Sequence, residues 1–124
     1  MTDAMRMPDR EDDVTQPANI GEWEWNIVAD RVTWSDDLYR LYGLEPREFR
    51  ASYDAFVQRI HPDDRRRVEL ILRQALRDGK AVDFEHRLMR PDGSVRMLSC
   101  RAEVEQGPDG QPRRMWGTAR DITR

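Results

Sequence analysis

The sequence lacks the features that mark several large classes of protein. It has a single cysteine, Cys100, which excludes an internal disulfide. No apolar run is long enough for a signal peptide or a transmembrane helix, so we expect a cytoplasmic protein with no membrane partner. Its 21 lysines and arginines are offset by 24 aspartates and glutamates, which leaves no basic surface for nucleic acid. With 124 residues, one globular domain is the expected organisation.

Motifs that usually carry catalysis are missing as well. The sequence contains no glycine-rich phosphate loop, no zinc-ligand spacing and no Ser-His-Asp arrangement. Asp63 and Asp64 are adjacent, but neighbours in a first helical turn point in different directions. They therefore suit stabilisation of the helix dipole better than acid–base chemistry. We expect no enzymatic activity and no metal site.

The chain begins with a segment whose apolar residues follow neither the period of a helix nor that of a strand. Residues 1–19 combine acidic clusters with two prolines, which predicts a mobile arm or docking segment ahead of a folded domain of residues 20–124. Trp23 and Trp25 then alternate with polar residues, and this period of two predicts a strand. A second short strand is expected to end at Trp34.

Helix signals follow these two strands. Ser35 is a good N-cap for a helix that stops at Gly43, and Ser52 can cap a second short helix. A longer helix should run over residues 62–77 and stop at Gly79. Its apolar residues follow the spacing of one buried stripe, formed by Val68, Ile71, Leu72, Ala75 and Leu76.

The last third of the chain, residues 81–124, reads as three consecutive strands. Asp92-Gly93 and Asp109-Gly110 lie between alternating apolar and polar runs, which is the composition of tight hairpin turns. Because the helices are segregated between the strands, they should lie on one face of a five-stranded antiparallel sheet. We therefore predict an α+β fold in which short helices and one longer helix cover a single face of the sheet.

Several local motifs occur together in a fixed order. They are GEWEWN, VTWSDDLYRLYGLEP, IHPDDRRRV, FEHRLMRPDGSVR and GTARDIT. The ordered set closely resembles the PAS sensory domain, in the subgroup with HPDD and RPDG motifs, over about residues 20–123. The resemblance implies a sheet with helices folded over one face, enclosing a small pocket that binds a cofactor or metabolite or is filled by side chains.

The resemblance also implies partners. PAS domains work as input or dimerisation modules of histidine kinases, diguanylate cyclases and related proteins, so we expect a homodimer and a kinase or cyclase effector. The DIT ending marks the junction to the next element. This assigns Asp121 and Thr123 to the exit of the signal, with Asp121 paired to a basic neighbour. The simpler reading of Asp121 is a cap at the end of a strand.

Period-two alternation selects the side chains that face the helices and line the candidate pocket. Gly117 and Ala119 have little side chain and should leave volume for a ligand, unless Trp25, Trp34 or Tyr42 fills it. The candidate pocket residues are Trp25, Trp34, Leu38, Tyr42, Phe56, Phe84, His86, Leu88, Leu98, Cys100, Met115, Gly117 and Ala119.

The sequence leaves the cofactor unknown. His86 is the titratable residue on the inner face, and either binds a ligand or metal or is a satisfied core histidine. A flavin domain with cysteine photochemistry is disfavoured, because the reactive motif resembles NCRFLQ and the matching region here has no cysteine. Haem is weakly disfavoured, because no histidine falls within the predicted long helix. Cys100 is expected to be an unreactive thiol in an apolar row.

The opposite face of the sheet is less polar than a free surface. Four apolar residues point away from the helices and predict a contact surface covered by the N-terminal arm or a second protomer: Met89, Val95, Met97 and Trp116. Scattered exposure is the alternative.

Two candidate functions therefore remain. One is a signal-input domain that binds a small ligand, and the other is a ligand-free interaction module whose core is filled by its own side chains.

Overall fold

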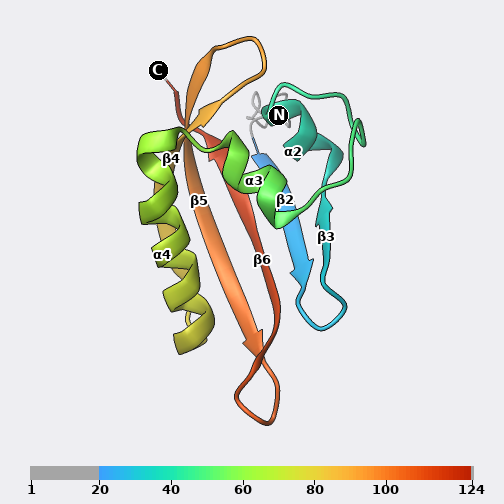
Figure 1. The fold of residues 1–124 in the computed structure, drawn as a ribbon, viewed down its shortest axis with the longest axis vertical. Coiled ribbons are helices and arrows are strands. Elements are labelled where there is room, and N and C mark those ends of the chain that lie inside the picture. The colour runs from blue at the N-terminus through green and yellow to red at the C-terminus, as the bar shows by residue number, and fades with distance from the viewer. Residues whose placement is uncertain (1–19, 124) are drawn as a thin grey trace, which may run out of the picture.

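A computed structural model describes residues 20–123; the expected arm, residues 1–19, lies outside the described residues. The described chain forms one five-stranded antiparallel sheet in the order β3-β2-β6-β5-β4 (Figure 1). The strands are β2 (Ile20–Asn26), β3 (Arg31–Trp34), β4 (Val82–Met89), β5 (Val95–Gln106) and β6 (Pro112–Asp121).

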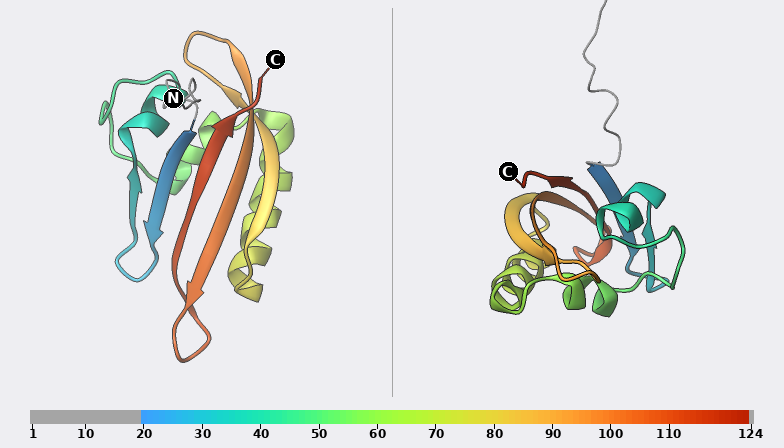
Figure 2. Two further views of the ribbon diagram at one scale, coloured as in Figure 1. Left: turned by 180° about the vertical axis from the view of Figure 1, so that it is seen from behind. Right: turned by 90° about the horizontal axis from the view of Figure 1, so that it is seen from above.

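Three helices lie on one side of this sheet: α2 (Asp36–Leu41), α3 (Tyr53–Arg59) and α4 (Pro62–Asp78). In the view from above α3 and α4 lie under the curved sheet and α2 lies beside β2 and β3, and from behind β4 and β5 lie in front of α4 (Figure 2). The α+β prediction is therefore confirmed, with the helices on a single face. Within residues 20–123, no helix is long and apolar enough to cross a membrane.

Capping explains where the helices begin and end. The Ser35 hydroxyl accepts a hydrogen bond from the backbone N–H of Leu38, and Ser52 does the same for Ala55. The long helix α4 ends at Gly79, whose φ of 66° is the left-handed conformation that glycine adopts most easily. The helix boundaries predicted from these residues agree with the structure to within one or two positions.

The central strand is β6, which pairs with β2 on one side and β5 on the other. Burial alternates along it, and Met115, Gly117 and Ala119 form a buried row that faces the helices. Phe84, His86 and Leu88 form the corresponding row on β4. The alternation in the sequence therefore predicted the inner face of both strands correctly.

One side chain of α4 was misread from the sequence. Val68, Leu72 and Ala75 are buried, as the stripe predicted, but Asp64 is buried with them. Its carboxylate accepts hydrogen bonds from the backbone N–H of Arg87 at 2.8 Å and from the Arg87 guanidinium at 2.8 and 3.1 Å.

Arg87 belongs to β4, an edge strand of the sheet, and its free backbone is satisfied by the start of α4. The Arg87 carbonyl accepts from the N–H of His61, and its N–H donates to Asp64. This contact closes part of an edge that another strand would otherwise be able to join. Asp64 therefore connects the helix to the sheet, and dipole stabilisation alone does not account for it.

We expect Asp64→Asn to destabilise the domain by about 2 kcal/mol, because hydrogen bonds to charged groups contribute roughly 1.5–3 kcal/mol. Asp63→Asn is a matched control, since Asp63 is the adjacent residue of the same helical turn and its side chain is 77% exposed. The control should change stability by less than about 0.5 kcal/mol. Urea unfolding of the two variants measures the difference.

The Asp64–Arg87 pair also predicts how the free energy of unfolding depends on pH in the acid range. The Arg87 side-chain hydrogen bonds hold the pKa of Asp64 well below its usual range. Stability from this pair is therefore present above the ordinary aspartate pKa of about 3.9 and is lost as the pH falls below it toward the lowered folded value. Equal unfolding free energies for wild type and Asp64→Asn at pH 7 would contradict the role of the pair.

Candidate functional site

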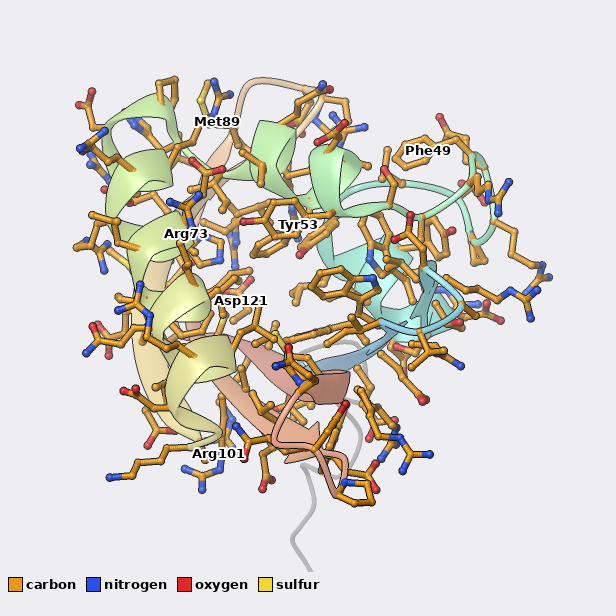
Figure 3. The ribbon with its side chains drawn as sticks, turned by 60° about the horizontal axis from the view of Figure 1, so that its bottom comes forward. Phe49, Tyr53, Arg73, Met89, Arg101 and Asp121 are labelled. Atoms are coloured by element: carbon orange, nitrogen blue, oxygen red, sulfur yellow. The ribbon has the colours of Figure 1, made fainter. Side chains whose placement is uncertain are left out.

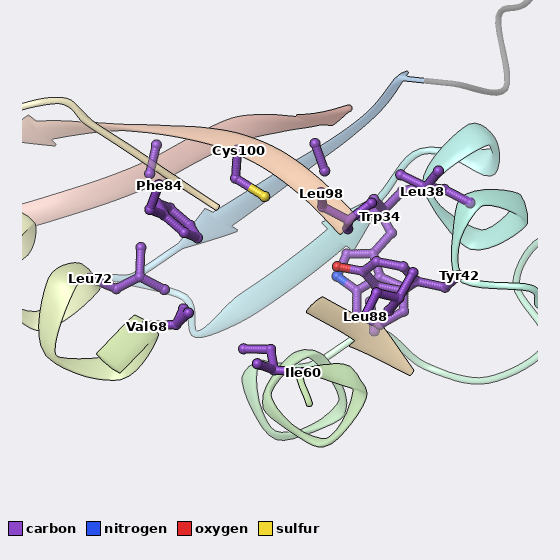
Figure 4. Packing of buried hydrophobic residues seen from close by; sticks show 14 of the residues in the cluster. Trp34, Leu38, Tyr42, Ile60, Val68, Leu72, Phe84, Leu88, Leu98 and Cys100 are labelled. Atoms are coloured by element: carbon purple, nitrogen blue, oxygen red, sulfur yellow. The ribbon is translucent and has the colours of Figure 1, made fainter. Parts of the chain in front are cut away.

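The predicted pocket residues do come together between the sheet and the helices. Trp25 and Phe56 are partly buried, and the rest are buried in this core (Figure 4). The buried members are Trp34, Leu38, Tyr42, Phe84, His86, Leu88, Leu98, Cys100, Met115, Gly117 and Ala119. They come from β3, from α2 and its C-cap and from the last three strands, so side chains far apart along the chain share one core, and their role as a ligand pocket stays a prediction.

Aromatic rings fill much of this space. The Trp34 ring lies with its centroid 5.1 Å from Tyr39, 5.1 Å from Tyr42 and 5.9 Å from Phe49. Tyr39 and Phe49 were not among the predicted pocket residues. Edge-to-face and tilted aromatic pairs of this kind pack favourably in a core. The packing of Trp34 and Tyr42 therefore supports the alternative that large aromatic side chains, and not a ligand, fill the interior.

A cavity of about 30 Å³ remains beneath α3. Its walls are mostly aromatic or aliphatic, and comprise Trp23, Trp25, Val32, Trp34, Leu38, Tyr42, Ser52, Tyr53, Phe56 and Leu72. Ligand pockets usually measure roughly 300–1,000 Å³, so this volume suits a water-sized occupant rather than a flavin or a haem.

Five wall residues were not among the predicted pocket residues: Trp23, Val32, Ser52, Tyr53 and Leu72. The spacing in the sequence pointed to two of them, Trp23 and Tyr53. Trp23 shares its strand face with Trp25, and Tyr53 lies one helical turn before Phe56. Tyr53 reaches from α3 into the space between α3 and the sheet (Figure 3), with its ring centroid 6.1 Å from Trp25.

Gly117 does not leave the volume expected from the sequence. A Cβ at this position would meet the backbone oxygen of Arg101, and it would lie 2.9 Å from Cζ2 of Trp23. The small residue therefore admits a close approach of backbone and indole, which leaves no room there for a ligand. The expectation of ligand space above Gly117 is wrong for this structural reason.

His86 is the polar side chain buried deepest in the inner face, at 1% exposure. Its Nδ1 lies 3.0 Å from the carbonyl oxygen of Arg87. Because a carbonyl only accepts, Nδ1 carries the proton. Its Nε2 is buried with no partner among the described residues. Burial lowers the pKa of His86, so the ring is neutral near pH 7.

The single thiol is poorly suited to chemistry. Cys100 is buried on β5, and burial raises the pKa of its thiol to about 12. A protonated thiol is a weak nucleophile and a weak metal ligand. Among residues 20–123, no group of three or more His, Cys, Asp or Glu side chains is placed to hold a metal ion.

The predicted contact residues lie in two separate groups on the outer face. Val95 pairs with Met89, close to Met97 at one end of β5. Trp116 pairs with Glu103 on the same strand, six positions from Met97, which is about 20 Å at 3.3 Å per residue. The four residues therefore do not form one continuous patch.

The two groups also differ in exposure. Val95 and Met89 are exposed, and exposed Ile122 donates its backbone N–H to the carbonyl of Met97 beside them. Trp116 is only half-exposed, and the Arg114 guanidinium lies 4.2 Å from its ring centroid. Glu24 holds this guanidinium by a hydrogen bond of 2.6 Å. An open groove of about 430 Å³ surrounds this tryptophan on the outer face.

The end of the chain is fixed to the sheet by a network of polar contacts. Asp121 accepts from Arg96 at 2.8 Å and from the N–H of Thr123 at 2.9 Å. The Thr123 hydroxyl in turn accepts from the N–H of Met97 at 2.7 Å. Burial alone would raise the pKa of Asp121, but the Thr123 and Arg96 hydrogen bonds lower it overall. The basic partner expected for Asp121 is therefore Arg96.

A family model described as the PAS fold matches residues 31–119. Sensor protein FixL of Bradyrhizobium diazoefficiens is 29% identical over 103 residues, which are 83% of this chain and 20% of FixL. A blue-light-activated histidine kinase of Brucella ovis is 28% identical over 118 residues, which are 95% of this chain and 23% of that kinase. The chain thus spans about a fifth of the length of these relatives.

A solved structure shares both the fold and part of the sequence. It is a sensory box histidine kinase/response regulator from Burkholderia thailandensis, with a TM-score of 0.74 and 28% identity. The match covers 93% of this chain and 86% of that chain. Since the family model also matches well over half of the sequence, the chain belongs to the PAS family.

Proposed function

We propose that this chain is a sensory signal-input domain whose output leaves through the end of β6. One observation carries the proposal. The buried row of Met115, Gly117 and Ala119 continues along the same face to Asp121, which Arg96 and Thr123 hold at the exit of the chain. A displacement on the inner face therefore acts directly on the residues that orient the outgoing segment.

The effector that we propose is a histidine kinase or a diguanylate cyclase, in the same chain or in a partner. PAS domains occur with both kinds of effector. A sensor of this kind responds to a stimulus only through the difference in affinity between its two conformations. We assign the chain to the subgroup with HPDD and RPDG motifs, with a domain boundary at residue 20, a cytoplasmic location and no catalysis of its own.

The inner face is where we place the stimulus, as a small-molecule ligand held under α3. The cavity of about 30 Å³ supports a water-sized occupant in the present conformation. A larger ligand requires movement of α3, and that helix is suited to move because none of its residues is fully buried. The alternative function is a ligand-free interaction module, which the aromatic packing around Trp34 supports.

The outer face is where we place the homodimer contact. Exposed Met89, Val95 and Ile122 and half-buried Met97 lie beside the Asp121 junction, so a change at the exit would alter the contact with a second protomer bound there. Trp116 suits this role less well than the sequence indicated, because Arg114 covers one side of its ring.

We expect Asp121→Ala to reduce the signal amplitude of a fusion to its kinase or cyclase effector by at least about threefold. The variant removes the carboxylate that holds Arg96 and Thr123, so the exit segment is no longer fixed to the inner face. Arg120→Ala serves as the control, because Arg120 is an exposed neighbour on the same strand. Effector turnover with and without stimulus measures the amplitude, and a normal amplitude in Asp121→Ala would show that the junction carries no signal.

Native mass spectrometry tests the dimer and the ligand together. We expect wild type to give a dimer, Val95→Arg to give monomers and Trp116→Arg to remain dimeric, because a charge at Val95 would lie inside the apolar contact. Monomers produced by Trp116→Arg alone would move the interface to the other group of residues. The same spectra, together with an absorption spectrum of the purified protein, test for a ligand. A bound metabolite or a cofactor absorption band supports ligand sensing, whereas the mass of the protein alone supports the interaction module.

A further inference from the structure

We infer that Nε2 of His86 is the hydrogen-bond acceptor for a small neutral ligand, about the size of one aromatic ring, that carries an O–H or N–H donor. The inference rests on the ligand-binding form of the proposed function. It starts from a buried imidazole whose two nitrogens have unequal surroundings.

The tautomer follows from the neighbouring backbone. The Arg87 carbonyl accepts from Nδ1 of His86 and also from the N–H of His61. Asp64 binds the N–H and the guanidinium of Arg87, and the N–H of His61 binds its carbonyl, so the two peptide units that flank Arg87 have little freedom to rotate away. The proton therefore stays on Nδ1, and Nε2 keeps a free lone pair.

The free lone pair has a cost in the core. A buried acceptor without a donor destabilises a protein, and most buried polar groups therefore have a partner. Asp64 and Arg67 are the charged groups that act on His86, and their effects on the imidazolium oppose each other. Burial disfavours the cation as well. A neutral ligand that donates a hydrogen bond is therefore the partner that fits Nε2.

Phe56 neighbours both His86 and the cavity, which His86 itself does not line. Its ring stands edge-on to His86 with centroids 6.1 Å apart, and the same ring lines the cavity under α3. Phe56 is only partly buried, and it belongs to the helix with no fully buried residue. If Phe56 turns outward, the vacated volume is that of one aromatic ring, bounded by His86 and by the cavity walls at Tyr53 and Trp25.

The wall chemistry sets the ligand class. Aromatic faces favour an apolar or aromatic body, and one polar group converging on the site fixes its orientation. A charged ligand would lose its hydration, and the cavity walls, within residues 20–123, carry no charged side chain to compensate for that loss. Phenol therefore has the expected chemistry, and toluene is its matched control, because it has nearly the same shape and no donor.

The first test measures binding of phenol and toluene to the wild type and to Phe56→Ala. We expect phenol to bind at least about tenfold more tightly than toluene in both proteins, with the higher affinity in Phe56→Ala, where the ring volume is already open. In Phe56→Ala/His86→Leu this preference should disappear while toluene binding is retained. Equal affinities for the two probes, or a preference that survives His86→Leu, would overturn the inference.

The second test needs no variant. The chain has two histidines, and they should show opposite tautomers in nitrogen-15 NMR, because Nδ1 of His61 accepts from the N–H of Asp63. Phenol should shift the Nε2 signal of His86, with no change at His61 and no shift with toluene. A proton found on Nε2 of His86 would refute the inference. Signalling by the Asp121→Ala fusion is a separate measurement. A proton on Nε2 would therefore refute the ligand inference and would not contradict the signal-input role.

Discussion

The carboxylate of Asp64 is the constraint on which the arrangement of the inner face depends. It holds the N–H and the guanidinium of Arg87 against the start of α4, and the carbonyl of the same residue accepts from His61 and from His86. Helix, edge strand and buried imidazole are thus held by one short segment of backbone. An ion pair of this kind adds less to stability than its short distances indicate, because the Asp64 carboxylate loses hydration and water screens the Arg87 side chain, which is 38% exposed. Its larger effect is to set the orientation of His86.

The central position of β6 gives the sheet a direct route between its interior and its exit. Inner-face residues contact the helices, and two positions beyond Ala119 the same face presents Asp121 to Arg96. No rearrangement of a separate element is needed to carry a displacement from one to the other. The outer face is less simple, because its apolar residues fall into two groups separated by polar and charged side chains of β5.

The interior combines tight aromatic packing with a small unfilled region under α3. Trp34 and its neighbours form a rigid wall, whereas Phe56 and Tyr53 come from a short helix that is only partly buried. A core built in this way tolerates movement of one helix without loss of the sheet, which is what a sensor with two conformations of similar free energy requires. The Phe56 ring of this helix stands edge-on to His86, whose Nε2 has no partner among the described residues.

The sequence by itself determined the elements, their boundaries and the side of each strand that faces inward, because caps, turns and alternation are local properties. Ser35, Ser52 and Gly79 act on residues within one turn, and period two assigned Phe84, His86 and Leu88 to one face. The tertiary structure alone decided which distant groups meet. Asp64 with Arg87, Trp23 over Gly117 and the separation of Trp116 from Met97 all follow from strand register and helix placement. These are distances across the fold, and no local pattern of residue types encodes them.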